Sequence, residues 1–417
     1  MPVQEIIQGF RNVEKPIMSL IWAVFFVQLI DASFFMLFNY YLRDLNYSDT
    51  EIAMVTAFRY VAIMVLAFPL GVYIKGRRLK PFFKIAAITL PLTTLGVIYA
   101  VENNIQWALM LGMILFGVFR LMIQVAAMPF IILNAKRDTH SEAISLYFQT
   151  FSVSIFISGI LYFILNSLSP DFFTEKVMLQ LVALLGLCGF YFVLRIKVEE
   201  KVTEMVSFRK VFHAYDWGRI LNALIPTFLI AIGAGFTIPF INLFFQSVHG
   251  IDSKEFSLLG SFSFVLVTIM LTFIPYIRRR YGYQTVIVGF QSMAILALFI
   301  MASTEWYKDL AIALPLAIGA YLLRQPFMNV AAPATSELSL YYVGERNQEI
   351  MGALQAAIWS GSWFVSSLLF GWMRSLEISY VNIFMITIVL YIIATQWYVI
   401  LIKKYKKELG EEGIELK

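Results

Sequence analysis

The chain has 417 residues, of which 60% are hydrophobic and only 14% are charged, and its mean hydropathy is +0.76. A soluble domain carries about 25% charged residues, so this composition excludes a water-soluble fold and predicts an all-α protein that crosses a membrane many times. The net charge of +5 does not indicate a nucleic-acid partner, because the cations are spread over many short connections. One cysteine, Cys188, and three scattered histidines exclude a disulfide framework and a metal site, so we expect no cofactor.

Twelve apolar runs, each long enough to cross a bilayer as a helix, follow one another along the chain. The first six lie at residues 16–41, 52–74, 82–101, 107–133, 143–165 and 177–194, and six more at 220–245, 256–277, 285–302, 310–332, 351–373 and 380–402. We expect twelve transmembrane helices in two six-helix bundles. The bundles comprise residues 1–195 and 220–417, the second ending in a short basic tail, with a cytoplasmic linker at residues 196–219.

The distribution of Lys and Arg predicts the orientation, because these residues are retained on the cytoplasmic side. With the N-terminus inside, the cytoplasmic segments hold 24 of the 32 Lys and Arg residues, and the outer connections hold five. We expect both termini in the cytoplasm, the basic segments against the anionic inner leaflet, and the first span to remain as an uncleaved anchor. The short outer connections favour the inner (cell) membrane of a bacterium as the location of the protein.

Short segments recur at one nearly constant spacing. Gln124-Val-Ala-Ala in the fourth run matches Asn329-Val-Ala-Ala in the tenth at an offset of 205 residues, and a Phe-Gln pair at 148–149 matches a Leu-Gln pair at 354–355. A shift by six helices preserves orientation, so the halves are expected to be parallel, pseudo-symmetric repeats. Transporters built from parallel repeats bind substrate near the bilayer midplane between the repeats.

Two basic segments carry a resemblance to a known family. After the second run the chain reads Gly71-Val-Tyr-Ile-Lys75-Gly-Arg77-Arg78, and after the eighth it reads Arg278-Arg-Arg-Tyr-Gly282. With twelve runs in two parallel sixes, the chain resembles the major facilitator superfamily over essentially its whole length, although Lys75 stands where the family motif has an aspartate. The resemblance implies alternating access by two six-helix bundles, with helices one, four, seven and ten around a central cavity.

Ionisable residues inside spans are costly to insert, so each is a functional hypothesis. Asp31 lies in the middle of the first span and shares a helix face with Gln28 and Asn39, and Arg120 lies at similar depth in the fourth span, four residues before Gln124. We expect an Asp31–Arg120 pair in which Asp31 takes and releases a proton while Arg120 alternates between Asp31 and substrate. A purely structural ion pair is the alternative.

Other candidate residues are placed by the repeat and by composition. We expect Arg59 to lie nearer the outer surface, where its long side chain can snorkel to water or headgroups, and to have a structural role. We expect Arg324 to be either a substrate contact or an interhelical bond. Further candidates for substrate binding, which helix packing explains as well, are Gln149, Asn329, Gln355 and Trp359. We expect helices to bend during gating at four residues, Gly233, Gly235, Pro239 and Pro326. The alternative for the glycines is that they permit close packing of helices.

The sequence therefore predicts a secondary active transporter for a small organic solute, with surplus arginine favouring an anion and with protons as the coupling ion. We expect a monomer in the lipid bilayer, and no enzyme, because His-Glu-x-x-His and Gly-x-Ser-x-Gly are absent. No ATP-binding Gly-x-x-x-x-Gly-Lys segment occurs either. The alternative is a multidrug, amphiphile or lipid exporter of the same fold, although Gly159 lacks the proline that follows it in drug exporters.

Overall fold

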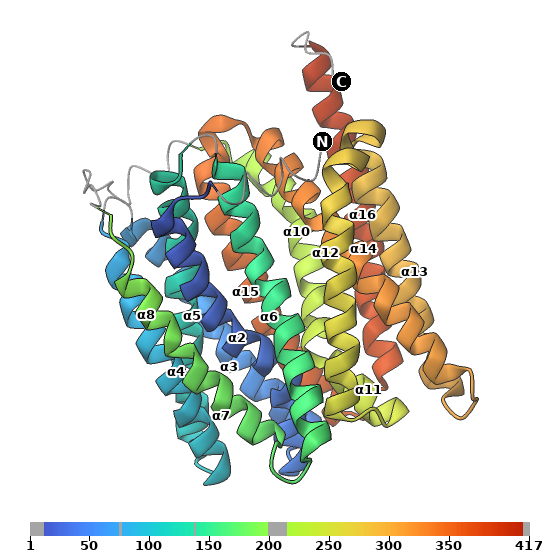
Figure 1. The fold of residues 1–417 in the computed structure, drawn as a ribbon. Coiled ribbons are helices and arrows are strands. Elements are labelled where there is room, and N and C mark those ends of the chain that lie inside the picture. Colours follow the sequence, from blue (N-terminus) through green and yellow to red (C-terminus); the bar gives the residue numbers. More distant parts are fainter. Residues whose placement is uncertain (1–11, 75–76, 137–138, 199–214, 412–417) are drawn as a thin grey trace. The chain divides into compact units, whose positions relative to one another are not determined.

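The computed structural model describes residues 12–74, 77–136, 139–198 and 215–411, and these residues are almost entirely helical (Figure 1). Most of the predicted linker, at 199–214, and the end of the basic tail, at 412–417, lie outside the described residues. The chain divides into two compact units. Unit 1 contains Met1–Tyr47, Phe58–Lys210 and Ser253–Ser261, and unit 2 contains Ser48–Ala57, Val211–Asp252 and Phe262–Lys417.

Unit 1 is built around one buried helix. Its helices are α2 (Lys15–Asp44), α3 (Asp49–Ile74), α4 (Lys80–Glu102), α5 (Gln106–Asn134), α6 (His140–Leu168), α7 (Glu175–Gly186) and α8 (Cys188–Leu194). Helix α2 packs against α6, α7 and α8 and is 72% buried along its apolar stretch. A helix with apolar residues on most sides is buried among other helices, which agrees with the place of α2 at the centre of the unit.

Unit 2 is arranged around a second such helix. Its helices are α10 (Trp217–Thr237), α11 (Ile241–His249), α12 (Ser253–Gln284), α13 (Phe290–Ser303), α14 (Ala313–Val343), α15 (Glu345–Ser375) and α16 (Tyr380–Glu411), with short turns η2 (Ile238–Phe240), η3 (Thr285–Gly289) and η4 (Thr304–Tyr307). Helix α10 packs against α15 and α16. Within α12 the chain changes direction at Gly282, whose φ of +74° favours glycine.

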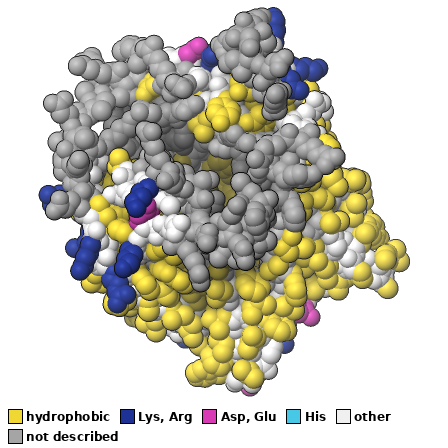
Figure 2. All heavy atoms as spheres, turned by 45° about the horizontal axis from the view of Figure 1, so that its top comes forward, with side chains coloured by type: hydrophobic (Ala, Val, Ile, Leu, Met, Phe, Trp, Pro, Cys, Tyr) yellow, Lys and Arg dark blue, Asp and Glu magenta, His cyan; other side chains and the backbone are white. Residues whose placement is uncertain are grey.

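Ten described helical segments are long and apolar enough to cross a membrane, as expected of a multi-pass membrane protein. Helices α14 and α15, with 31 residues each, are also long enough to span. These segments are consistent with the twelve expected from the sequence. On the face in Figure 2, hydrophobic side chains cover the flank, and Lys and Arg gather near one end. A flank of this kind suits contact with lipid.

The segment from α10 to α11 is interrupted by a short 3₁₀ turn. The 3₁₀ turn η2 contains Pro239, which has no backbone N–H. Side chains of neighbouring helices bond to carbonyls just before the break: Thr387 donates to the Gly233 oxygen at 2.9 Å and Ser366 to the Ile232 oxygen at 2.8 Å. Such bonds satisfy polar backbone groups away from water.

Both glycines of α10 are positions of close packing. A Cβ added to Gly233 would lie 2.8 Å from the Tyr391 ring, and one added to Gly235 would lie 2.7 Å from the Cβ of Ser366. The packing alternative therefore holds at these two positions, while bending stays a prediction. Helix α14 runs without interruption through Pro326, and bending during gating stays a prediction at this proline as well.

Candidate functional site

Unit 1 contains a buried cluster of three charged residues. The Asp31 side chain of α2 is buried, with 4% of the residue exposed. Its Oδ1 accepts a hydrogen bond from Nη2 of Arg59 in α3, and its Oδ2 accepts one from Nε of Arg120 in α5 at 2.9 Å. The Asp31–Arg120 contact predicted from the sequence is present, and Arg59 is a second cation on the same carboxylate.

The expectation that Arg59 snorkels outward is wrong. Arg59 is only 8% exposed, it pairs with Asp31, and its guanidinium lies 4.9 Å from the ring centre of Phe116. Its place in the apolar run indicated its depth but not the direction of its side chain, and the carboxylate and ring on neighbouring helices stabilise it inside the bundle. A Cβ at Gly117 of α5 would clash with the Arg59 carbonyl oxygen, so this glycine permits α3 and α5 to approach at the depth of the cluster.

The two arginines differ in their access to water. The Arg120 side chain is 29% exposed, against 10% for Arg59. Arg120 also points Nη1 toward Oε1 of Gln124 at 3.5 Å, and Gln124 is exposed. Arg120 is therefore the more exposed cation of the cluster, and Arg59 is the more enclosed one.

The remaining candidates of unit 1 lie on two helices. On α2, Asn39 is buried and Gln28 is half-buried, with its Oε1 lacking a hydrogen-bond partner among the described residues. Gln149 is exposed on α6. Of the candidates in this unit, the structure brings Asp31, Arg120 and Gln124 together.

The candidates of unit 2 lie on α14 and α15. Arg324 is almost completely buried, at 1% exposure, and donates from Nη1 to Oε1 of Gln325 at 2.9 Å. Asn329 donates to the Gln325 carbonyl of its own helix. On α15, Gln355 is half-buried and Trp359 is 37% exposed.

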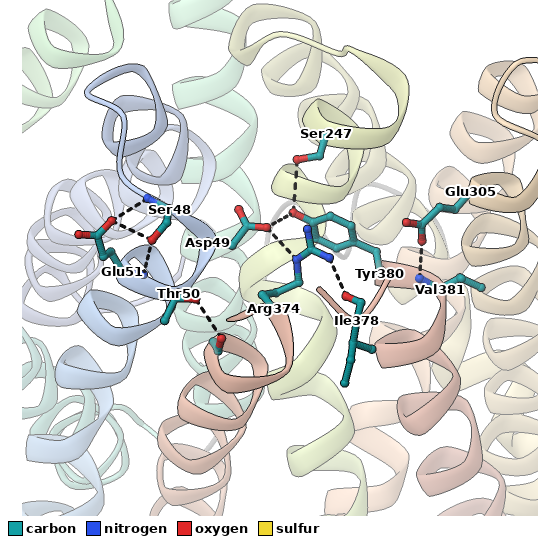
Figure 3. Close-up of polar contacts among 11 residues, drawn as sticks. Ser48, Asp49, Thr50, Glu51, Ser247, Glu305, Arg374, Ile378, Tyr380 and Val381 are labelled. Carbon is teal, nitrogen blue, oxygen red and sulfur yellow. Dashed lines mark hydrogen bonds and ion pairs between the residues drawn. The ribbon is translucent and has the colours of Figure 1, made fainter. Parts of the chain in front are cut away.

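A second cluster, which we did not predict, connects the start of α3 to α15 and α16 in unit 2 (Figure 3). Asp49 Oδ2 accepts from Nε of Arg374 at 2.9 Å and from the Tyr380 hydroxyl at 2.7 Å. The Arg374 guanidinium lies 4.2 Å from the Tyr380 ring centre, and Thr50 donates to the Gly371 carbonyl at 3.1 Å. Asp49 and Arg374 are 325 positions apart, so no local pattern connects them.

The pseudo-symmetric positions in unit 1 make a related contact. Ser253, the first residue of α12, donates to Oε1 of Glu175, the first residue of α7, and the Tyr162 hydroxyl donates to the same oxygen at 2.8 Å. Asp49 and Ser253 are offset by 204 residues, and Glu175 and Tyr380 by 205. The repeat offset was the only sequence signal that pointed to these positions, and donor and acceptor are exchanged between the two copies.

Among the described residues there is no group of three His, Cys, Asp or Glu side chains placed to hold a metal ion. The polar groups of both clusters are instead guanidinium, amide, carboxylate and hydroxyl groups. Groups of these kinds can bind and orient a solute by charge and hydrogen bonds, as a few well-placed polar groups do in small-molecule sites.

The solved structures that this chain resembles include several transporters. The chain matches the nucleoside transporter NupG at TM-score 0.70, with 13% identity, 94% of this chain and 100% of that chain covered. It matches a D-xylose-proton symporter at TM-score 0.69, with 14% identity, and the match covers 92% of this chain and 95% of the symporter. A bacterial homologue of the iron transporter ferroportin, in its inward-facing state, matches at TM-score 0.69 with 13% identity. This match covers 93% of this chain and 98% of the homologue.

No curated protein matches the sequence significantly. The family model of the Major Facilitator Superfamily, however, matches residues 20–362, which is most of the chain. This match agrees with the helical fold and with the resemblance seen in the basic segments. The chain therefore belongs to the major facilitator superfamily, and it is a membrane transport protein rather than an enzyme.

Proposed function

We propose that this protein is a secondary active transporter that moves a small organic anion by alternating access and couples this movement to protons. The observation that carries the proposal is the charge of the Asp31 cluster. Two guanidinium groups contact one carboxylate, so the cluster holds one excess positive charge within a helix bundle. A concentrated positive charge with low-dielectric surroundings attracts anions.

Arg120 is the proposed first contact for the anion. Its partial exposure and its position beside the exposed amide of Gln124 support this role. A carboxylate or phosphate oxygen can take the place of the Asp31 oxygen on the planar guanidinium, because both present the same acceptor geometry. Further hydrogen bonds and ring contacts are proposed for Gln28, Asn39, Gln149, Asn329, Gln355 and Trp359.

Proton coupling follows from the balance of charge at Asp31. A bound monovalent anion cancels the excess positive charge, and a proton on Asp31 restores it. The charge inside the bundle then stays the same with and without the cargo, so each transport cycle moves the anion together with one proton and carries no net charge. Arg59 holds Asp31 in place when Arg120 turns to the solute. One structural neighbour is a D-xylose-proton symporter, which supports proton coupling within this fold.

Uptake into proteoliposomes identifies the solute class. Purified protein is tested with a panel of small carboxylates, phosphates and sulfonates, and with neutral sugars and nucleosides, under an imposed proton or sodium gradient. We expect uptake of an anion that depends on the proton gradient and is lost in Arg120→Gln. Transport of neutral solutes alone would contradict the anion proposal.

The role of Asp31 has a separate test. In Asp31→Asn, the carboxylate is replaced by an amide of the same shape that cannot carry the proton. We expect loss of proton-driven uptake while counterflow exchange of the solute is retained. Unchanged coupling to protons in Asp31→Asn would overturn this assignment.

We also propose that the protein acts as a monomer with both termini in the cytoplasm, in the inner membrane of a bacterium. The exposed cations Lys84, Arg195 and Lys197, near the start of α4 and the end of α8, support this orientation. For the test, Lys197→Cys and Lys308→Cys are made separately in a Cys188→Ala background. A membrane-impermeant thiol reagent added to whole cells should label position 308 and spare position 197, and the reverse pattern would invert the orientation.

A further inference from the structure

Arg324 of α14 is a buried guanidinium without an ion pair among the described residues. It is the largest of the fully buried side chains, at 1% exposure. Of its five N–H donors, one bonds to Gln325, whereas its Nε and Nη2 atoms have no hydrogen-bond partner among the described residues. A guanidinium removed from water in this way is costly unless something compensates its charge.

The sequence around Arg324 offers no carboxylate to do so. Along the chain, the nearest acids are Asp309, which precedes α14, and Glu337, at 15 and 13 residues from Arg324. Thirteen residues of α-helix extend about 20 Å along the axis, so position 337 is remote from position 324 on this helix. The runs that form α10 and α16 contain no acid between Asp216 and Asp252 or between Glu377 and Glu408. The partner of Arg324 is therefore not an acid of these three helices.

The groups near Arg324 are hydroxyls and an amide. Tyr391 of α16 and Tyr321 of α14 both interact electrostatically with Arg324, and Tyr321 also interacts with Gln325 and with Ser263 of α12. The Tyr391 hydroxyl has no partner with hydrogen-bond geometry among the described residues. These hydroxyls can donate hydrogen bonds, so together with the guanidinium they suit an anion.

The position of Tyr391 is fixed by a glycine on a third helix. A Cβ added to Gly233 of α10 would lie 2.8 Å from Cε1 of the Tyr391 ring and 3.0 Å from Cδ1. The absence of a side chain at position 233 therefore lets the ring lie against α10. The cluster is enclosed by α10, α14 and α16 within unit 2.

Arg324 is not the counterpart of Arg120. The repeat offset of 205 residues aligns Arg120 with Gln325, and adjacent helix positions differ by about 100° in direction. The exposures differ accordingly: the Arg120 side chain is 29% exposed, and Arg324 is 1% exposed. Arg324 is closed to water, whereas Arg120 is partly open to it.

We propose that Arg324, with the Tyr391 hydroxyl, holds a small inorganic anion inside unit 2, with chloride as the fitting probe. The anion compensates the buried guanidinium and accepts hydrogen bonds from Nε, Nη2 and the tyrosine. Arg324 is 1% exposed on α14, whereas the Arg120 side chain is 29% exposed on α5, so this site is separate from the one proposed for the transported solute. It assigns to Arg324 a role other than the substrate contact expected from the sequence.

Thermal stability of the purified full-length protein tests the site. The melting temperature is measured in detergent at constant ionic strength while chloride replaces isethionate, a bulky sulfonate. A ligand that binds only the folded protein raises the melting temperature in proportion to the logarithm of its concentration above Kd. We expect this rise for chloride, and equilibrium binding of radioactive chloride at about one ion per chain.

Three variants test whether chloride binds at Arg324 and Tyr391. Arg324→Gln should lose both the melting-temperature rise and the bound chloride, and in chloride-free buffer it should melt no lower than the wild type, because the uncompensated charge is gone. Tyr391→Phe keeps the ring against Gly233 and should weaken chloride binding without abolishing it. Arg120→Gln, at the proposed solute site, should keep the full chloride response.

Two outcomes overturn the proposal. The first is that the wild type melts at the same temperature in chloride and in isethionate. The second is that the chloride response persists in Arg324→Gln. Either result would mean that no anion binds at Arg324. A rise with a carboxylate such as propionate, lost in Arg324→Gln and not produced by chloride, would instead assign Arg324 to solute recognition. Failure of proton-driven uptake would leave the chloride measurement unaffected, so the two proposals fail separately.

Discussion

Arg59 and Arg120 bind the same carboxylate but are surrounded differently. Arg59 is enclosed between Asp31 and the Phe116 ring, whereas Arg120 is partly open to water. Removing one partner of a buried ion pair costs about 3–5 kcal/mol, because the other charge is left buried and uncompensated. The cost is smaller where the removed group was partly solvated and the carboxylate keeps a second partner.

The first prediction concerns the order of these costs. Arg59→Gln should lower the melting temperature of the purified protein clearly more than Arg120→Gln, since only Arg120→Gln leaves Asp31 with its enclosed partner. Arg120→Gln should instead lose solute uptake while remaining folded. Equal destabilisation by the two variants would contradict the distinction between an enclosed and an exchangeable arginine.

Gly117 leads to a second prediction, because its lack of a side chain lets α5 approach the backbone of α3 at Arg59. Gly117→Ala should push α3 away, break the Arg59–Asp31 contact and reduce both stability and uptake. Gly96→Ala on α4 is the matched control, since a Cβ there meets nothing within 4 Å. Alanine is favoured over glycine in helices by about 0.5–1 kcal/mol, so the control should match or exceed the wild type in melting temperature.

Among the helices, α3 stands out because its first turns belong to unit 2 and the rest belongs to unit 1. Asp49 is 8% exposed and bonds to both Arg374 and Tyr380, which fixes the start of α3 against α15 and α16. The first turns of α12 cluster with unit 1 in the corresponding way.

The third prediction tests the contacts at the start of α3. Asp49→Asn removes the charge that Arg374 and Tyr380 contact, and hydrogen bonds to charged groups contribute about 1.5–3 kcal/mol each. The melting temperature should fall. Glu51→Gln, two residues along, is the control, because Glu51 is exposed and bonds only to Ser48 in the contacts drawn in Figure 3. A fall in Glu51→Gln as large as in Asp49→Asn would show that the charge of Asp49 has no special part.

At the scale of the whole molecule, the helical fold was readable from the sequence because the bilayer imposes long apolar runs on every span. The Asp31–Arg120 contact was also predictable, since both residues lie at similar depth in helices that the family resemblance brings together. The direction of Arg59 was not, because a nearly uniform apolar helix has no distinct face. Asp49 and Arg374 could not be connected either, as their contact depends on how distant helices meet.

The last prediction follows from the charge balance proposed for transport. If one proton accompanies each monovalent anion, every cycle moves no net charge, and the membrane potential supplies no driving force. Initial uptake into proteoliposomes should then respond to a pH gradient and stay unchanged when a potassium gradient with valinomycin sets the potential. In Asp31→Asn, no proton accompanies the anion, so net anion movement carries charge and any residual uptake should become sensitive to the potential. Strong potential dependence in the wild type would mean that Asp31 does not balance the solute charge, even if the solute itself proves to be an anion.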